Sequence, residues 1–206
     1  MSSKNIRLEY LYTDLEASMR RLRQQHDPVS QSRKIVDSAL LDGEAHYGIN
    51  TGFGVLANKR ISPEELTTLQ QNILLSHACG VGAPIPPNIT RLMLQLKIHS
   101  LSLGYSGVSE QTFRQLLAIE ASELLPWVPS RGSVGASGDL APLAHLCLPL
   151  IGRGEVWDDT LSEKVPASVA LEQKGIKPIA LQAKDGLALI NGTQMMAAYG
   201  SFVLER

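Results

Sequence analysis

The chain has 206 residues, of which 44% are hydrophobic, and its 19 basic and 20 acidic side chains give a formal net charge of −1. This balance argues against a nucleic-acid-binding or membrane-surface protein, and no uncharged apolar run reaches the ~20 residues that cross a bilayer. Because the N-terminus lacks the apolar segment of a signal peptide and the only cysteines are Cys79 and Cys147, we expect a cytoplasmic protein with both thiols buried.

The first half of the chain predicts helices separated by a glycine loop. Residues 8–22 carry a leucine or methionine every three or four positions, which indicates an amphipathic helix. The arginine cluster at 20–23 is expected on its solvated face. Residues 47–58 hold three glycines in seven positions and predict a loop with unusual backbone angles. A capping box at 62–65 (SPEE) begins the next helix, which the glycines and proline at 80–84 end.

The second half also predicts helices, from about residue 88 to 103, from 109 to before Pro126, and from a capping Asp139 to about 150. Residues 152–162 are irregular and compatible with a short hairpin, and a short helix is expected near 167–174. A last helix begins near Asp185 and continues to the end. Over 187–204 it is apolar on more than one side, which is typical of a helix buried among others. We therefore expect a mainly α chain cut from a longer one.

The most informative stretch is the glycine-serine loop at 132–145. From its glycine content alone, it is a turn that leads into a capped helix. It lacks the Gly-Lys-Ser/Thr ending of a P-loop and the glycine spacing that follows the first strand of a dinucleotide-binding fold. It also lacks the spacing of a hydrolase nucleophile elbow. The loop therefore predicts none of these three common sites.

Three ordered motifs resemble signatures of the aromatic amino acid ammonia-lyases and aminomutases. They are residues 47–54 (YGINTGFG), 135–145 (GASGDLAPLAH) and 186–193 (GLALINGT). The resemblance covers roughly residues 41–206. It implies a mainly α, fumarase/aspartase-like ammonia-lyase fold. Residues 1–184 would form the N-terminal domain, and 185–206 the first, truncated helix of the central helical bundle.

The resemblance implies that the chain makes its own cofactor, 4-methylidene-imidazole-5-one, from Ala136, Ser137 and Gly138. The Gly138 nitrogen attacks the Ala136 carbonyl carbon and two waters are lost, one of them from the Ser137 side chain. Gly138 has no side chain to block this approach, and the surrounding fold must hold the backbone bent. The ring is an electrophile that turns the amine of an amino acid into a better leaving group, so no external cofactor is expected.

Two positions are expected to support this ring. Asp139 would cap the following helix and, by the resemblance, take part in ring formation. Gly54 would bring a backbone group to the site. The histidines His46, His99 and His145 have no metal-ligand spacing, so no metal site is expected.

Tyr47 and Asn191 join Ser137 as the expected catalytic residues. Taken alone, Tyr47 is a turn tyrosine with a half-buried ring, and Asn191 is an asparagine that bonds its local backbone. In the matched motifs, Tyr47 resembles the family's active-site tyrosine, which contacts the substrate and takes part in proton transfer. Asn191 resembles the residue that contacts the ring or the substrate.

Ser76 and His77 fall where the family's substrate-selective pair lies. On its apolar helix face, His77 alone is also compatible with an ordinary core histidine. Histidine-specific members resemble Ser-His here, tyrosine-specific members tend to His-Leu, and phenylalanine-specific members tend to Phe-Leu. A pocket that hydrogen-bonds an imidazole rejects an apolar ring. The pair therefore indicates L-histidine, converted to urocanate and ammonia, with a tyrosine or phenylalanine lyase or aminomutase as the alternative.

Family subunits are more than twice this length and assemble as homotetramers. Their later part supplies a second tyrosine, an arginine and a glutamate, none of which maps onto this chain. The expected partners are L-histidine and further copies of the subunit, without nucleic acid or membrane. The isolated chain is expected to be inactive, and a non-catalytic fragment with a folding or association role is a further alternative.

Overall fold

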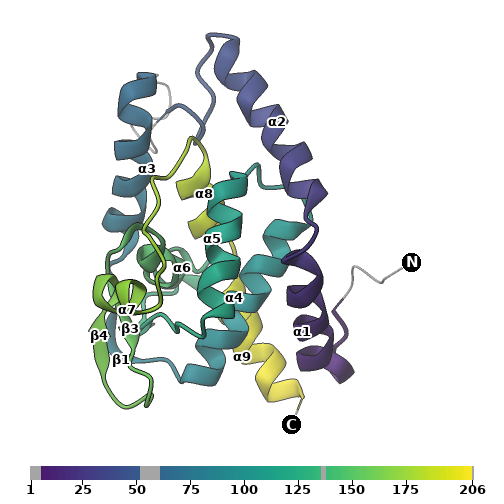
Figure 1. Cartoon of the computed structure of the whole chain (residues 1–206), viewed down its shortest axis with the longest axis vertical. Coiled ribbons are helices and arrows are strands. Elements are labelled where there is room, and N and C mark those ends of the chain that lie inside the picture. The colour runs from purple at the N-terminus through teal and green to yellow at the C-terminus, as the bar shows by residue number, and fades with distance from the viewer. Residues whose placement is uncertain (1–5, 52–60, 136–137, 206) are drawn as a thin grey trace.

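The computed structural model describes residues 6–51, 61–135 and 138–205. They form the mainly α fold that the sequence predicts, with two small antiparallel strand pairs (Figure 1). The elements in chain order are η1 (Leu8–Tyr10), α1 (Leu11–Leu22), α2 (Asp27–Leu41), α3 (Pro63–His77), β1 (Val81–Pro84), α4 (Pro87–Ser102), α5 (Glu110–Ala121), β2 (Pro129–Arg131), α6 (Leu140–Cys147), η4 (Leu148–Ile151), β3 (Glu155–Trp157), β4 (Lys164–Pro166), α7 (Ala167–Gln173), α8 (Asp185–Ile190) and α9 (Gln194–Leu204).

Helix α4 is the centre of the hydrophobic core. Helices α1, α5 and α9 all pack against it (Figure 1), and both α4 and α5 begin and end close to the predicted positions. The predicted apolar face is confirmed from Leu11 to Leu22, since Leu11, Leu15, Met19 and Leu22 are buried. Leu8, predicted on the same face, lies in η1 and is exposed. Helix α3 packs against α6 and α8 and links this core to the glycine-serine loop.

The arginine cluster of α1 is only partly a solvated face. The Arg23 guanidinium lies 2.6 Å from the carboxylate of Glu120, whose side chain is almost fully buried. Arg20 makes only a long, exposed contact with Glu16. Arg23 therefore anchors α1 to α5, which the sequence pattern did not indicate.

Both strand pairs come from segments that the sequence left irregular. Strands β1 and β2 pair Val81 with Arg131 and Pro84 with Pro129. In the β1 segment the sequence predicted only the end of a helix. Strands β3 and β4 form the suggested hairpin, which runs four residues beyond the predicted 152–162 segment. The β1–β2 pair matters for the site because β2 leads directly into the glycine-serine loop.

The predicted continuous last helix is wrong, because α8 ends at Ile190 and α9 starts at Gln194. Asn191 has extended backbone angles, and the Gly192 carbonyl accepts a hydrogen bond from the Asp139 N–H at 2.8 Å. Tertiary contacts therefore interrupt an apolar pattern that is continuous in the sequence. Both helices contribute buried side chains to the same core as the rest of the chain, including Leu189, Ile190, Met195 and Ala198.

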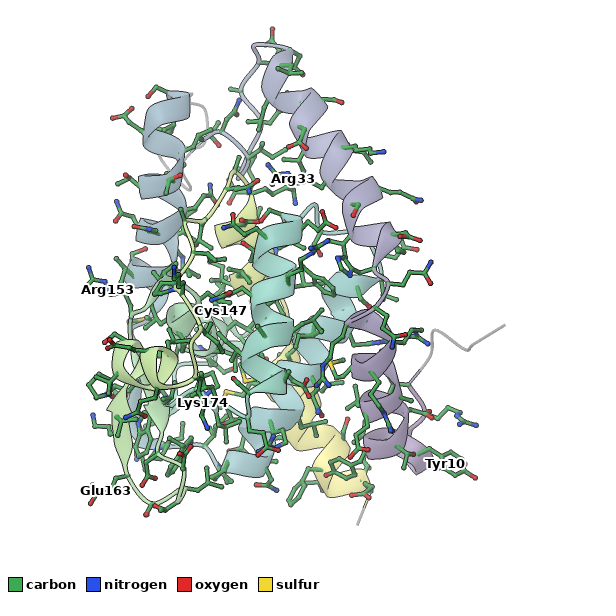
Figure 2. All side chains as sticks on the ribbon, in the orientation of Figure 1. Tyr10, Arg33, Cys147, Arg153, Glu163 and Lys174 are labelled. Atoms are coloured by element: carbon green, nitrogen blue, oxygen red, sulfur yellow. The ribbon has the colours of Figure 1, made fainter. Side chains whose placement is uncertain are left out.

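The two cysteines differ in environment. Cys147 is fully buried, as predicted, and Figure 2 shows it in the interior between the helices. Cys79 is exposed, so the prediction that both thiols are buried is wrong for Cys79. It lies in the short link between α3 and β1, just beyond the helix face that enters the core. Within the described ranges, no helix has the length and apolarity needed to cross a bilayer.

Candidate active site

The structure describes most, but not all, of the predicted site. Tyr47, Ser76, His77, Gly138, Asp139 and Asn191 lie in the described ranges. Ala136, Ser137 and Gly54 lie outside the described residues. The geometry of the site is therefore built from the turn that follows Ser137 and from the elements that surround it.

Gly138 occupies a buried turn that only glycine fits. Its φ is +89°, in the left-handed region that residues with a Cβ rarely adopt. A Cβ added here would lie 2.8 Å from the Gly192 carbonyl oxygen. The Gly138 N–H donates to the Gly135 carbonyl at 2.8 Å, which brings these two glycines together. Gly138 is thus held between the Gly135 and Gly192 carbonyls in a conformation that glycine adopts readily.

Asp139 holds this turn against α9, and the prediction that it caps the next helix is wrong. The residue is fully buried and precedes α6, but its side chain makes no capping bond to α6. Its carboxylate instead accepts from the Ser133 hydroxyl at 2.7 Å and from the Met196 N–H at 3.0 Å. Met196 is the third residue of α9, so Asp139 stabilises the N-terminus of a helix distant in sequence.

At the break between α8 and α9, the third sequence motif (residues 186–193) contacts the second (residues 135–145). The Gly192 carbonyl accepts from Asp139 N–H and faces Gly138. The neighbouring Asn191 carbonyl accepts from the Lys97 ammonium at 3.0 Å, while the Asn191 side chain is exposed. The structure therefore joins Gly138, Asp139 and the Asn191 backbone into one cluster.

Sequence reasoning missed Lys97, which is 1% exposed. Burial lowers the pKa of Lys97 to about 8, and the nearby Cys147 thiol opposes this shift. Burial also raises the pKa of Cys147 to about 12. The sequence contained one signal: Lys97 lies directly between the apolar residues Leu96 and Ile98 of α4.

His145, to which the sequence assigned no role, connects α6 to the start of β1. Its Nε2 accepts a hydrogen bond from the Gly80 N–H at 3.0 Å. Burial lowers the pKa of His145, with Glu155 acting in the opposite direction, and the accepting ring must be neutral. A Cβ on Gly80 would lie 3.2 Å from this imidazole, and one on Gly132 would lie 3.2 Å from Gly80. The glycine-serine loop therefore lies directly against this bond.

Ser76 and His77 end α3, the helix that packs against α6 and α8. The Nδ1 atom of half-buried His77 lies 2.7 Å from the Ile73 carbonyl, so the proton belongs on Nδ1 and Nε2 is the accepting nitrogen. The exposed Ser76 hydroxyl lies 3.2 Å from the same Nδ1 and 3.3 Å from the Ile73 carbonyl. Tyr47 lies in the turn after α2, and the residue is exposed, at 58%, where the sequence alone predicts a half-buried ring.

Comparison with known proteins gives one consistent family. The pattern of the aromatic amino acid lyases matches residues 12–206. A histidine ammonia-lyase of Anaeromyxobacter dehalogenans (strain 2CP-C) is 52% identical over 183 residues, which cover 86% of this chain and 36% of that protein. The chain thus spans about a third of the length of such relatives.

Solved structures show the same fold. The crystal structure of histidine ammonia-lyase from Trypanosoma cruzi has a TM-score of 0.79 at 36% identity, over 86% of this chain and 34% of that one. The phenylalanine aminomutase of Pantoea agglomerans has a TM-score of 0.80 at 32% identity, over 92% of this chain and 38% of that one. Both comparisons leave most of the other protein unmatched.

Proposed function

Since the chain belongs to the aromatic amino acid lyase family, we propose that it is part of an ammonia-lyase that converts L-histidine to urocanate and ammonia. The observation that carries the proposal is the buried turn in which Gly138 lies against Gly192. The names of relatives about half identical to this chain, which are histidine ammonia-lyases, support the choice of histidine.

We infer that 4-methylidene-imidazole-5-one forms from Ala136, Ser137 and Gly138. The fit of this group is supported at Gly138, where any side chain would meet the Gly192 carbonyl and whose N–H donates to the Gly135 carbonyl. A glycine nitrogen is the least hindered nucleophile for the Ala136 carbonyl carbon. When present, the ring supplies the electrophile that makes the substrate amine a better leaving group.

The chain's own residues have distinct proposed roles. Asp139 keeps the ring-forming turn on α9 through its bonds to Ser133 and Met196. Asn191 and Tyr47 would contact the substrate, since both side chains are accessible, and Tyr47 would move a proton at its phenolic oxygen. Gly54 would contribute a backbone group.

We propose that Ser76 and His77 select the substrate. The bond from His77 Nδ1 to the Ile73 carbonyl fixes the ring orientation, so that Nε2 can accept from the N–H of a substrate imidazole. A phenylalanine side chain has no N–H to donate, so it would not gain this hydrogen bond. A tyrosine or phenylalanine lyase or aminomutase is the second candidate, favoured by the equal structural similarity to the phenylalanine aminomutase.

The activity belongs to the protein at the full length of its relatives. We propose that residues 185–206, which contain α8 and α9, are the start of a central helical bundle there, with residues 1–184 as the preceding domain. We further propose that four subunits assemble in the cytoplasm. The 206-residue chain by itself would then be inactive and have at most a folding or association role.

Turnover of three amino acids tests the proposed function. Protein at the full family length is assayed with L-histidine, L-tyrosine and L-phenylalanine, and urocanate is followed by its absorbance. The proposal predicts that histidine has the highest kcat/KM. Faster turnover of tyrosine would overturn the role given to His77, and ammonia release by the isolated chain would overturn its proposed inactivity.

A further inference from the structure

A buried lysine lies behind the proposed site. Lys97 is among the largest of the described side chains that are fully buried, at 1% exposure, and its Nζ donates to the Asn191 carbonyl at 3.0 Å. Burial lowers the pKa of Lys97 to about 8, so the ammonium form still prevails near neutral pH. A cation is therefore held inside the core of α4 and α9.

The core itself gives no reason for a charge at this position. Within the described part of the chain, Lys97 forms no salt bridge with a carboxylate, and burial keeps the nearby Cys147 thiol protonated. A buried cation without a carboxylate partner costs free energy, and an apolar side chain of similar size would avoid that cost. The position of the ammonium therefore points to a task at its acceptor.

The acceptor of the Lys97 bond, the Asn191 carbonyl, is connected to the ring-forming turn through the next residue, Gly192. The Asn191 carbonyl ends α8, where a helix carries its partial negative charge. The next carbonyl, that of Gly192, accepts from the Asp139 N–H and faces Gly138 across the space that a Cβ would fill. A bond that holds the Asn191 carbonyl thus also holds the Gly192 carbonyl in its place next to Gly138.

We propose that Lys97 is a positioning residue for ring closure: its ammonium holds the Asn191–Gly192 backbone, and through it the Gly138 backbone, in the conformation from which the ring forms. This inference rests on the proposed function, because it requires that the ring forms. Lys97 transfers no proton and touches no reacting atom. It acts through Gly192 on the approach of the Gly138 nitrogen.

The test uses protein at full family length and measures ring formation rather than activity. The peptide that contains residues 136–138 is isolated at intervals after a pulse of synthesis, and the fraction lacking the mass of two waters is measured. Lys97→Met keeps the length and apolar stem but removes the donors, whereas Lys97→Arg keeps the charge and the donors. Lys184→Met is the matched control, because Lys184 also donates to a backbone carbonyl, that of Ser106 at 2.8 Å.

The expected result is a selective effect on ring formation. Lys97→Met should close the ring about 10- to 100-fold more slowly, because a misplacement of about 1 Å has effects of that size on a reaction of oriented groups. It should remain folded and at least as resistant to urea as the unchanged protein, since it removes a buried charge. Lys97→Arg should recover most of the rate, and Lys184→Met should match the unchanged protein.

Two results would overturn the inference. One is a Lys97→Met protein that loses the two waters as fast as the unchanged protein. The other is a Lys97→Met protein that is unfolded, because Lys97 would then hold the fold rather than position the turn. If the unchanged protein never loses the two waters, the proposed function fails first, and the two failures are thereby distinguished.

Discussion

The carboxylate of Asp139 accepts a hydrogen bond from the backbone N–H of Met196 at 3.0 Å, although the two residues are separated by four helical segments of the chain. This contact joins the ring-forming turn to the first turn of α9. Together with the bond from Ser133, it leaves both carboxylate oxygens paired inside the core. Asp139, which the sequence predicts as the cap of the next helix, thus connects two segments that are distant in the sequence.

The first prediction concerns this connector. Asp139→Ala should lower the free energy of unfolding by about 1–3 kcal/mol, because the Ser133 hydroxyl and the Met196 N–H both lose a buried, charged acceptor. Asp159→Ala removes an exposed carboxylate that pairs with Lys174 and should change stability by less than about 0.5 kcal/mol. Urea denaturation of both variants is the measurement, and equal stabilities would contradict the role of Asp139.

The second prediction concerns the fit at Gly138. Gly138→Ala should destabilise the protein by about 1–3 kcal/mol, since it combines a left-handed φ with a 2.8 Å contact, and it should abolish loss of the two waters. Gly175→Ala is the control because Gly175 has a φ of +67° and nothing within 4 Å of an added Cβ. Its cost should be that of backbone strain alone. A Gly138→Ala protein that still loses the two waters would show that the close fit is irrelevant.

Helical periodicity predicted α1, α4, α5 and α7, because each depends on apolar spacing and end signals within one segment. Strands β1 and β2 could not be predicted in this way, since their pairing joins segments more than forty residues apart. The break between α8 and α9 was missed for a related reason: the carbonyls at the break accept hydrogen bonds from Lys97 and Asp139, which are distant in the sequence.

The residues of the candidate site that lie in a sequence motif were predicted. The residue that stands out only by its burial in the fold was missed. Gly138 and Asp139 were recognised from their motif, and the structure explains why a glycine is needed at 138. Lys97 was missed because a lysine in a helical pattern usually reaches the surface, and here the fold buries it completely.

The third prediction is a loss of stability in acid through His145. Its Nε2 accepts from Gly80 only when neutral, and burial lowers its pKa in the folded state. The stability it provides is complete above its ordinary pKa of about 6.5 and is lost as the pH falls through the lower folded value. The free energy of unfolding should therefore decrease between about pH 7.5 and 5.5, and it should decrease less in His145→Gln.

His99 provides the comparison for this measurement, because burial lowers its pKa as well. His99→Gln should remove a separate part of the same acid effect and leave the His145 part in place. Identical pH profiles for the unchanged protein and His145→Gln would contradict the role given to the bond with Gly80.

The fourth prediction concerns substrate choice. In protein of full family length, replacing Ser76 by His and His77 by Leu together should lower kcat/KM for histidine by at least about 100-fold, because a polar partner of the imidazole is lost. Turnover of tyrosine should rise. Leu75→Gln, on an exposed position of the same helix, should leave both values unchanged. Unaltered histidine turnover in the double variant would show that Ser76 and His77 do not determine substrate specificity.

The intact mass of the peptide that spans residues 136–138 tests the central claim most directly. In protein of full family length, the account predicts a mass lower by two water molecules than the sequence requires, together with elimination of ammonia from histidine. An unmodified mass in protein that still eliminates ammonia would contradict it.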